Sequence, residues 1–161
     1  MTYEEIIEGI KSLQIQGATK IAMKACEAFG LKLKETQDRV ELEKVVEELA
    51  ATRSTEPGLR NALKYCLENY ETDTDVVEKA INHFKESKEK IAEYGSRKIH
   101  DGMKIFTHCH SSTVTNILIK AAKDGKKFEV YNTETRPRFQ GRLTAEELAK
   151  NGISVTHFVD S

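Results

Sequence analysis

The sequence predicts an α/β protein with an all-helical domain over residues 1–100 and the first part, three strands, of a parallel sheet over residues 101–161. Two observations predict this class. Apolar residues recur at helical spacing through the first hundred residues. After the turn signal His100-Asp101-Gly102, strand-like runs alternate with helical segments in the order β-α-β-loop-α-β. That order opens a doubly wound parallel sheet.

Five helices are expected in the first part. The first carries Ile6 and Ile10, and the second ends at Gly30. The third covers residues 40–51. The fourth starts at Pro57, and a fifth, roughly 25 residues long, opens at Asp75 and ends near Ile99.

The second part should contain strands over residues 104–110, 128–133 and 153–160. The connecting helices are expected to start after Ser111-Ser112 and at Thr144, where Glu147 completes a capping-box pattern. Right-handed crossovers put both helices on one face of the sheet. Parallel sheets are covered on both faces. The second face must therefore be covered by the helical part, by more chain or by a partner.

Composition and charge exclude several function classes. The 161 residues include 25 Lys+Arg and 26 Asp+Glu, for a net charge of −1, whereas a general nucleic-acid binder has a basic excess. No run of 18 apolar residues exists, so no membrane partner is expected. Cys26, Cys66 and Cys109 form no CxxC pair, and the N-terminus is unlike a signal peptide. These features predict a cytoplasmic protein.

A polar cluster, residues 107–113, follows the first expected strand, where open parallel sheets bind ligands. Free N–H groups and the helix dipole favour an anion such as phosphate there. The same field favours a thiolate, so Cys109 could be a reactive thiolate or a proton donor. The alternative is a buried, inert cysteine.

The His-Cys-His triplet also suggests a metal, but alternation on a strand would put His108 and His110 on one face and Cys109 on the other. One face then supplies two ligands, whereas a closed zinc site needs four, so we expect no metal. The other histidines should be surface or packing residues: His83, His100 and His157.

A second cluster, residues 134–142, follows the second strand and contains Arg136, Arg138 and Arg142. Guanidinium groups match phosphate oxygens, so this segment suits phosphate recognition. The alternative is a solvated loop whose arginines pair with local acids such as Glu134. In the helical part, residues 14–19 and 53–57 are expected to form two junctions between helices.

Residues 107–111 (THCHS) and 134–144 (ETRPRFQGRLT) resemble the initiation factor 2B alpha/beta/delta family, in particular its archaeal branch. That family includes ribose-1,5-bisphosphate isomerase and methylthioribose-1-phosphate isomerase. Residues 16–18 (QGA), 53–55 (RST) and the closing stretch 153–161 with its Val-Asp-Ser strand fit the family as well. The resemblance covers essentially the whole chain.

The resemblance implies a helical domain followed by a Rossmann-like domain, assembled into a homo-oligomer (dimers or hexamers). It implies an aldose-ketose isomerase that uses a cysteine and an aspartate as acid and base, without metal or nucleotide cofactor. Cys109 would be the catalytic cysteine. The resemblance places these residues at the substrate and its phosphates: Gln16, Gly17, Ala18, Thr19, Arg53 and Ser111, with Arg136 and Arg138 in support.

Two departures bear on this implication. Gln16 stands where many isomerases have Arg. The family's catalytic Asp belongs to a Gly-Ala-Asp motif downstream of the Val-Asp-Ser segment, which contains Asp160, and neither that motif nor the Asn-Lys substrate motif occurs in these 161 residues. We therefore expect this chain alone to be inactive.

The expected reaction is conversion of ribose 1,5-bisphosphate to ribulose 1,5-bisphosphate. The alternative is a non-catalytic factor 2B-like regulatory subunit that binds a nucleotide or sugar phosphate and initiation factor 2. Regulatory subunits of this family usually lack the cysteine, so Cys109 favours the isomerase.

Overall fold

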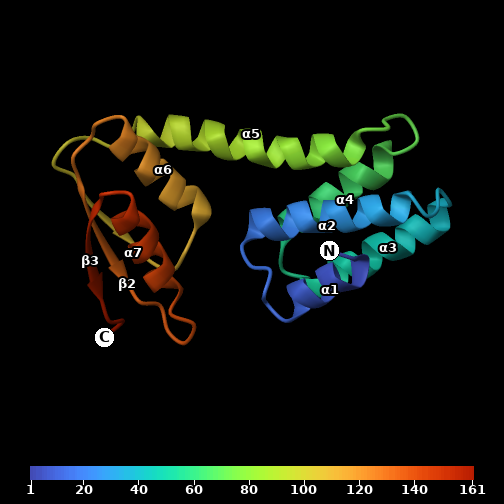
Figure 1. The fold of residues 1–161 in the computed structure, drawn as a ribbon, viewed down its shortest axis with the longest axis horizontal. Helices are drawn as coiled ribbons and strands as arrows, with labels where there is room; N and C mark the ends of the chain where they lie inside the picture. The colour runs from blue at the N-terminus through green and yellow to red at the C-terminus, as the bar shows by residue number, and fades with distance from the viewer. The chain divides into compact units, whose positions relative to one another are not determined.

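The computed structural model describes residues 1–161 and confirms the α/β class, with seven helices and a three-stranded parallel sheet (Figure 1). The chain divides into two compact units, Met1–Lys85 and Glu86–Ser161. This division falls inside helix α5, Val76–Ser96. The domain boundary at residue 100 stays a prediction. No helix combines the length and the apolar character needed to cross a membrane.

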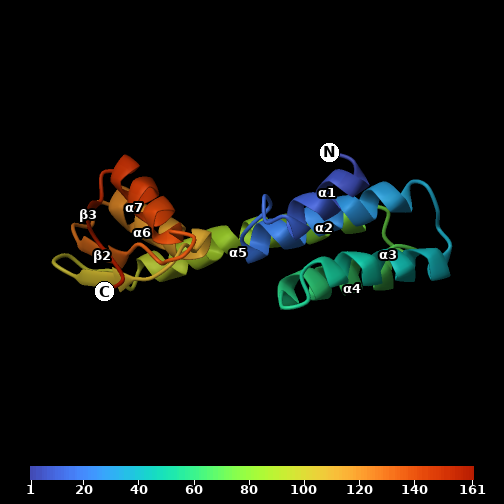
Figure 2. The ribbon, with the colours of Figure 1, turned by 90° about the horizontal axis from the view of Figure 1, so that it is seen from below.

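The first unit is built from α1 (Tyr3–Lys11), α2 (Ala18–Leu33), α3 (Arg39–Thr52), α4 (Pro57–Asn69) and the start of α5. Helix α2 packs against α1, α3 and α4, most extensively against α4. Figure 2 shows this bundle from below. The largest fully buried side chains of the unit form its core: Ile6, Ile10, Ile21, Phe29, Leu42, Leu49, Leu59, Leu63 and Val76.

Local sequence accounts for where these helices begin. Thr2 and Glu5 form a capping box, in which each side chain accepts the other residue's backbone N–H. The Asp38 side chain caps α3 by accepting the N–H of Glu41. Pro57 occupies the first turn of α4, where its missing N–H costs nothing.

The predicted end of the second helix at Gly30 is wrong, because α2 continues to Leu33. A Cβ atom at Gly30 would lie 3.2 Å from both γ-methyl carbons of Val77. Glycine therefore permits close packing between α2 and the first turn of α5. The fifth helix also ends earlier than expected, at Ser96.

The second unit contains β1 (Lys104–Thr107), α6 (Ser112–Lys123), β2 (Glu129–Thr133), α7 (Gln140–Lys150) and β3 (Ser154–Phe158). The strands run parallel in the order β1-β2-β3. Both helices, β2 and the residues just before β2 and β3 contribute to one core: Leu118, Ala121, Phe128, Val130, Leu148 and Ile153.

The two faces of this sheet differ. Ile105, Val130 and Val155 are aligned across the strands and belong to the core under α6 and α7, so both helices cover one face, as predicted (Figures 1 and 2). On the opposite face Phe106 is 66% exposed and Phe158 is 45% exposed. Within this unit, the aromatic face is therefore open.

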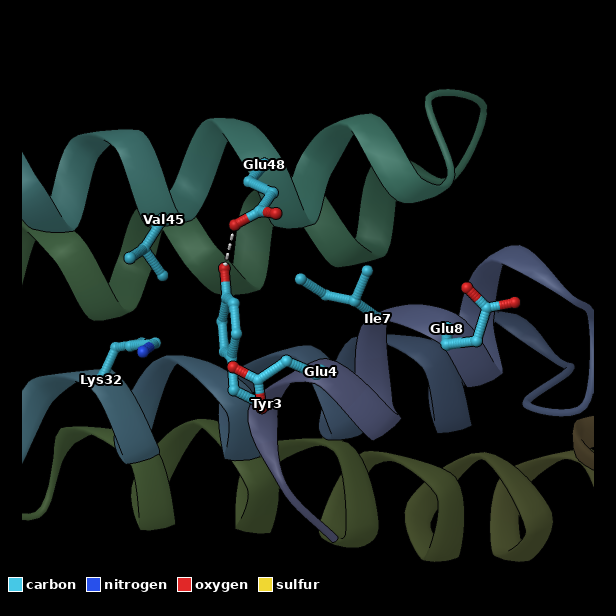
Figure 3. A pocket seen from close by; sticks show the side chains of 7 residues that line it. All are labelled: Tyr3, Glu4, Ile7, Glu8, Lys32, Val45 and Glu48. Carbon is cyan, nitrogen blue, oxygen red and sulfur yellow. Dashed lines mark hydrogen bonds between the residues drawn. The ribbon is translucent and has the colours of Figure 1, made fainter.

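A pocket of about 510 Å³ opens between α1, α2 and α3 in the first unit (Figure 3). The Tyr3 phenol, whose residue is 7% exposed, donates a hydrogen bond to Glu48 Oε2 at 2.7 Å. Lys32 Nζ lies 4.9 Å from the centroid of the Tyr3 ring. Burial, together with the Glu48 carboxylate, raises the pKa of Tyr3, so the phenol stays a donor.

Replacing Tyr3 by Phe keeps the ring and removes the hydrogen bond that joins α1 to α3. We expect Tyr3→Phe to lower the free energy of unfolding by about 1 kcal/mol, because the exposed Glu48 carboxylate can be rehydrated. Urea unfolding followed by circular dichroism measures this. Tyr65→Phe is the matched control, because the Tyr65 phenol makes no hydrogen bond and should change stability by less than about 0.5 kcal/mol. Equal effects of the two substitutions would contradict the expectation.

Candidate active site

Three polar segments meet at the carboxyl edge of the sheet, each directly after a strand. Cys109 follows β1, Thr135 follows β2 and Asp160 follows β3. The Cys109 N–H donates to Thr135 Oγ1 at 2.8 Å, and the Thr135 N–H donates to Asp160 Oδ1 at 2.8 Å. The two polar clusters that the sequence placed at this edge are therefore in contact.

Strand β1 ends at Thr107, and the backbone at Cys109 adopts φ 65°, in the left-handed region. The predicted strand through His110 is wrong, and so is the strand alternation inferred for its histidines. His108 and His110 instead bond to threonines from different elements: Thr133 Oγ1 at 2.6 Å and Thr144 Oγ1 at 3.0 Å, respectively.

Cys109 is held through its backbone on both sides and through its thiol. Its N–H binds Thr135, its carbonyl accepts the Thr144 hydroxyl at 2.9 Å, and its thiol donates to Gln140 Oε1 at 3.2 Å. The residue is half-buried. The alternative of an inert, fully buried cysteine does not fit this position.

The helix after β2 begins at Gln140, four residues before the predicted start at Thr144. Its N-cap is Phe139, in a left-handed conformation with φ 54°. Thr144 therefore lies inside the helix, where its buried hydroxyl binds Cys109 and not a helix N–H. The expected capping box is wrong, and Gln140 is a site residue that sequence reasoning missed.

Close packing between β2 and α7 fixes this segment. A Cβ atom at Gly141 would overlap the carbonyl oxygen of Thr133, so only glycine fits there. Asn132, fully buried on β2, donates to the Gly141 carbonyl at 2.6 Å. Its other amide atom, Oδ1, faces His157 Nδ1 at 2.9 Å, so His157 Nδ1 is the donor.

Asp160 binds the start of the arginine-containing loop. Its carboxylate accepts the N–H of Thr135 at 2.8 Å and the N–H of Arg136 at 2.6 Å. These hydrogen bonds, first that from Arg136, hold the pKa of Asp160 below its ordinary value. The sequence analysis placed Asp160 at the end of the third strand and assigned it no contact. That strand end is wrong, because β3 stops at Phe158.

The three arginines of the loop differ. Arg142 pairs with Glu134 through Nη2 and Oε2 at 2.8 Å, and its guanidinium lies 4.2 Å from the Phe139 ring centroid. The solvated-loop alternative therefore describes Arg142. Arg136 and Arg138 are exposed and form no ion pair, so both guanidinium groups are available to an anion.

Ser111 is the N-cap of α6, as predicted, and its hydroxyl accepts the Val114 N–H at 3.5 Å. The N-terminus of α6 therefore follows Cys109 directly. The described residues contain no group of three or more His, Cys, Asp or Glu side chains arranged to hold a metal ion.

The remaining predicted site residues lie in the first unit, at two helix junctions: Gln16, Gly17, Ala18, Thr19 and Arg53. Gly17 is the N-cap of α2 with φ 88°, a conformation suited to glycine. Arg53 follows α3, and its Nε lies 3.9 Å from Glu56 Oε1. Their place in a common site with Cys109 stays a prediction.

We expect iodoacetamide to modify Cys109 in the folded protein and to spare the other two cysteines. Cys109 is half-buried, whereas Cys26 and Cys66 are both 0% exposed in the core of the first unit. Peptide mass spectrometry after timed labelling measures each site, and labelling in denaturant provides the fully reactive control. Equal labelling of all three thiols in native buffer would contradict the described burial.

This chain matches known proteins over most of its length. Residues 14–161 match the initiation factor 2 subunit family. Ribose 1,5-bisphosphate isomerase of Thermococcus kodakarensis is 35% identical, over 98% of this chain and 55% of its own length. The enzyme of that name from Archaeoglobus fulgidus is 37% identical, with 98% and 55% covered. The chain thus spans about half the length of the curated relatives it matches.

Solved structures agree in fold. The Pyrococcus horikoshii translation initiation factor eIF-2B is 30% identical, with a TM-score of 0.82 over 98% of this chain and 59% of that one. The 5-methylthioribose 1-phosphate isomerase of the same organism, at 24% identity, has a TM-score of 0.72 over 99% and 52%. With a family match over residues 14–161 and relatives above 30% identity, this chain belongs to the initiation factor 2 subunit family.

Proposed function

We propose that this chain supplies the cysteine half of a sugar-phosphate isomerase that converts ribose 1,5-bisphosphate to ribulose 1,5-bisphosphate. The observation that carries the proposal is the half-buried thiol of Cys109, fixed at the sheet edge. Thr135, which binds its backbone, begins the loop that carries two unpaired guanidinium groups. The names of the relatives at 35% and 37% identity support the same reaction class.

In ribose 1,5-bisphosphate C1 carries a phosphate ester, so the conversion breaks the bond between C1 and the ring oxygen O4. The hydrogen on C2 moves to C1, the proton on O2 moves to O4, and C2 becomes the carbonyl carbon. The transfer needs an acid and a base placed on the reacting carbons. The Cys109 thiol fits one of these roles, because its backbone cannot shift while both neighbouring peptide groups stay bonded. The second group, in this proposal an aspartate, comes from polypeptide outside residues 1–161.

A substrate with two phosphates needs an anion site at each end. Arg136 and Arg138 provide exposed guanidinium groups at the end of β2, and the α6 N-terminus provides free N–H groups after Cys109. In the proposal, Gln16, Gly17, Ala18, Thr19, Arg53 and Ser111 complete the substrate site. Because Arg53 is only loosely paired with Glu56, at 3.9 Å, a phosphate can displace that contact.

The test compares wild type with Cys109→Ser in the complete polypeptide that the gene encodes, following ribose 1,5-bisphosphate by ³¹P NMR. We expect the serine variant to lose at least about 100-fold in kcat, because a hydroxyl is a far weaker acid than a thiol. Arg136→Gln should raise KM, whereas Arg142→Gln, the matched control already paired with Glu134, should change KM little. Full activity of Cys109→Ser would overturn the proposed role.

A second candidate is a regulatory subunit of translation initiation that binds initiation factor 2. It is favoured by the 30% identity to the protein described as translation initiation factor eIF-2B. Isothermal titration of the complete polypeptide with purified archaeal initiation factor 2 tests it. Under the isomerase proposal we expect no saturable binding. Saturable binding that Cys109→Ser leaves unchanged, by a protein without isomerase activity, would establish the second candidate instead.

A further inference from the structure

Asp160 accepts two backbone hydrogen bonds from the segment that follows β2. Its two carboxylate oxygens accept the N–H groups of Thr135 at 2.8 Å and Arg136 at 2.6 Å. A side chain directly after β3 thus holds the chain leaving β2 at two points.

Two threonines hold the chain that leaves β1. Thr135 Oγ1 accepts the N–H of Cys109 at 2.8 Å. Thr133 Oγ1, at the end of β2, lies 2.6 Å from His108 Nδ1. Because the Thr135 N–H also binds Asp160, Cys109 is tied to Asp160 through this one threonine.

Cys109 needs such support. Its φ of 65° lies in the left-handed region, which residues with a Cβ rarely adopt unless the surroundings impose it. From this backbone the thiol donates a hydrogen bond to Gln140 Oε1 at 3.2 Å. Loss of the Thr135 contact would free the backbone to relax.

We propose that Asp160 is a positioning residue, which holds Cys109 in place through Thr135. The effect of Asp160 on catalysis rests on the proposed function, whereas its effect on the position of Cys109 does not. A carboxylate suits the role because it only accepts hydrogen bonds. The amide of an asparagine would turn an N–H₂ donor toward one of the two backbone N–H groups.

The decisive variant is Asp160→Asn, studied in the complete polypeptide with two readouts. Alkylation of Cys109 by iodoacetamide should accelerate about five- to thirtyfold, the range that one or two lost hydrogen bonds can produce. The reason is that the thiol becomes more mobile once its backbone is released. In the isomerase assay, kcat should fall, because the thiol is no longer held in place.

The matched control is Asp101→Asn. The Asp101 carboxylate also accepts a backbone N–H, that of Lys127 at 2.7 Å, but beyond the amino ends of β1 and β2. A merely structural role for Asp160 would lower the melting temperature in both variants without changing Cys109 labelling. Thr135→Ser keeps the hydroxyl and should label like wild type, whereas Thr135→Val should label faster.

The labelling results decide whether Asp160 positions Cys109. Equal Cys109 labelling in Asp160→Asn, Asp101→Asn and wild type would overturn the proposal. If Asp160→Asn unfolds, Cys26 and Cys66 will label too, and Thr135→Val then becomes the deciding variant. Faster labelling of Cys109 in a protein without isomerase activity would support the positioning role and reject the proposed function.

Discussion

The left-handed backbone at Cys109 is the constraint on which the rest of the site depends. A residue with a Cβ pays roughly 1–2 kcal/mol for this conformation, so neighbouring bonds must impose it. Thr135 binds the preceding peptide and Thr144 binds the following one. These partners come from the end of β2 and from α7, so the thiol is fixed only when all three elements are assembled.

That assembly depends in turn on the fit between β2 and α7. Gly141 lets the helix begin against the carbonyl of Thr133, and Asn132 holds the helix by its first turn. This contact brings Thr144, one turn further along, to the Cys109 carbonyl. A glycine and a buried amide that do not themselves touch the thiol therefore help to determine where it lies.

Much of the architecture follows from the sequence because its signals are periodic. Strands, crossovers and the shared carboxyl edge could be predicted from the alternation of elements after residue 100. The errors arise where one residue type serves two purposes. Gly30 matches a helix end but serves close packing with Val77, and Thr144 matches an N-cap but serves Cys109. Such choices depend on tertiary contacts that local sequence does not contain.

Several residues of the site could be predicted from the sequence, but the hydrogen bonds that connect them could not. The resemblance pointed to Cys109 and the arginines, whereas the roles of Gln140, Thr135 and Asp160 appear only once the three strand ends are side by side. The arginines show the same limit. Three arginines lie within seven residues, but Arg142 forms an ion pair with Glu134, whereas Arg136 and Arg138 remain exposed. Two free guanidinium groups on a chain of net charge −1 suit a small phosphorylated ligand, because a nucleic acid would need a far wider basic surface.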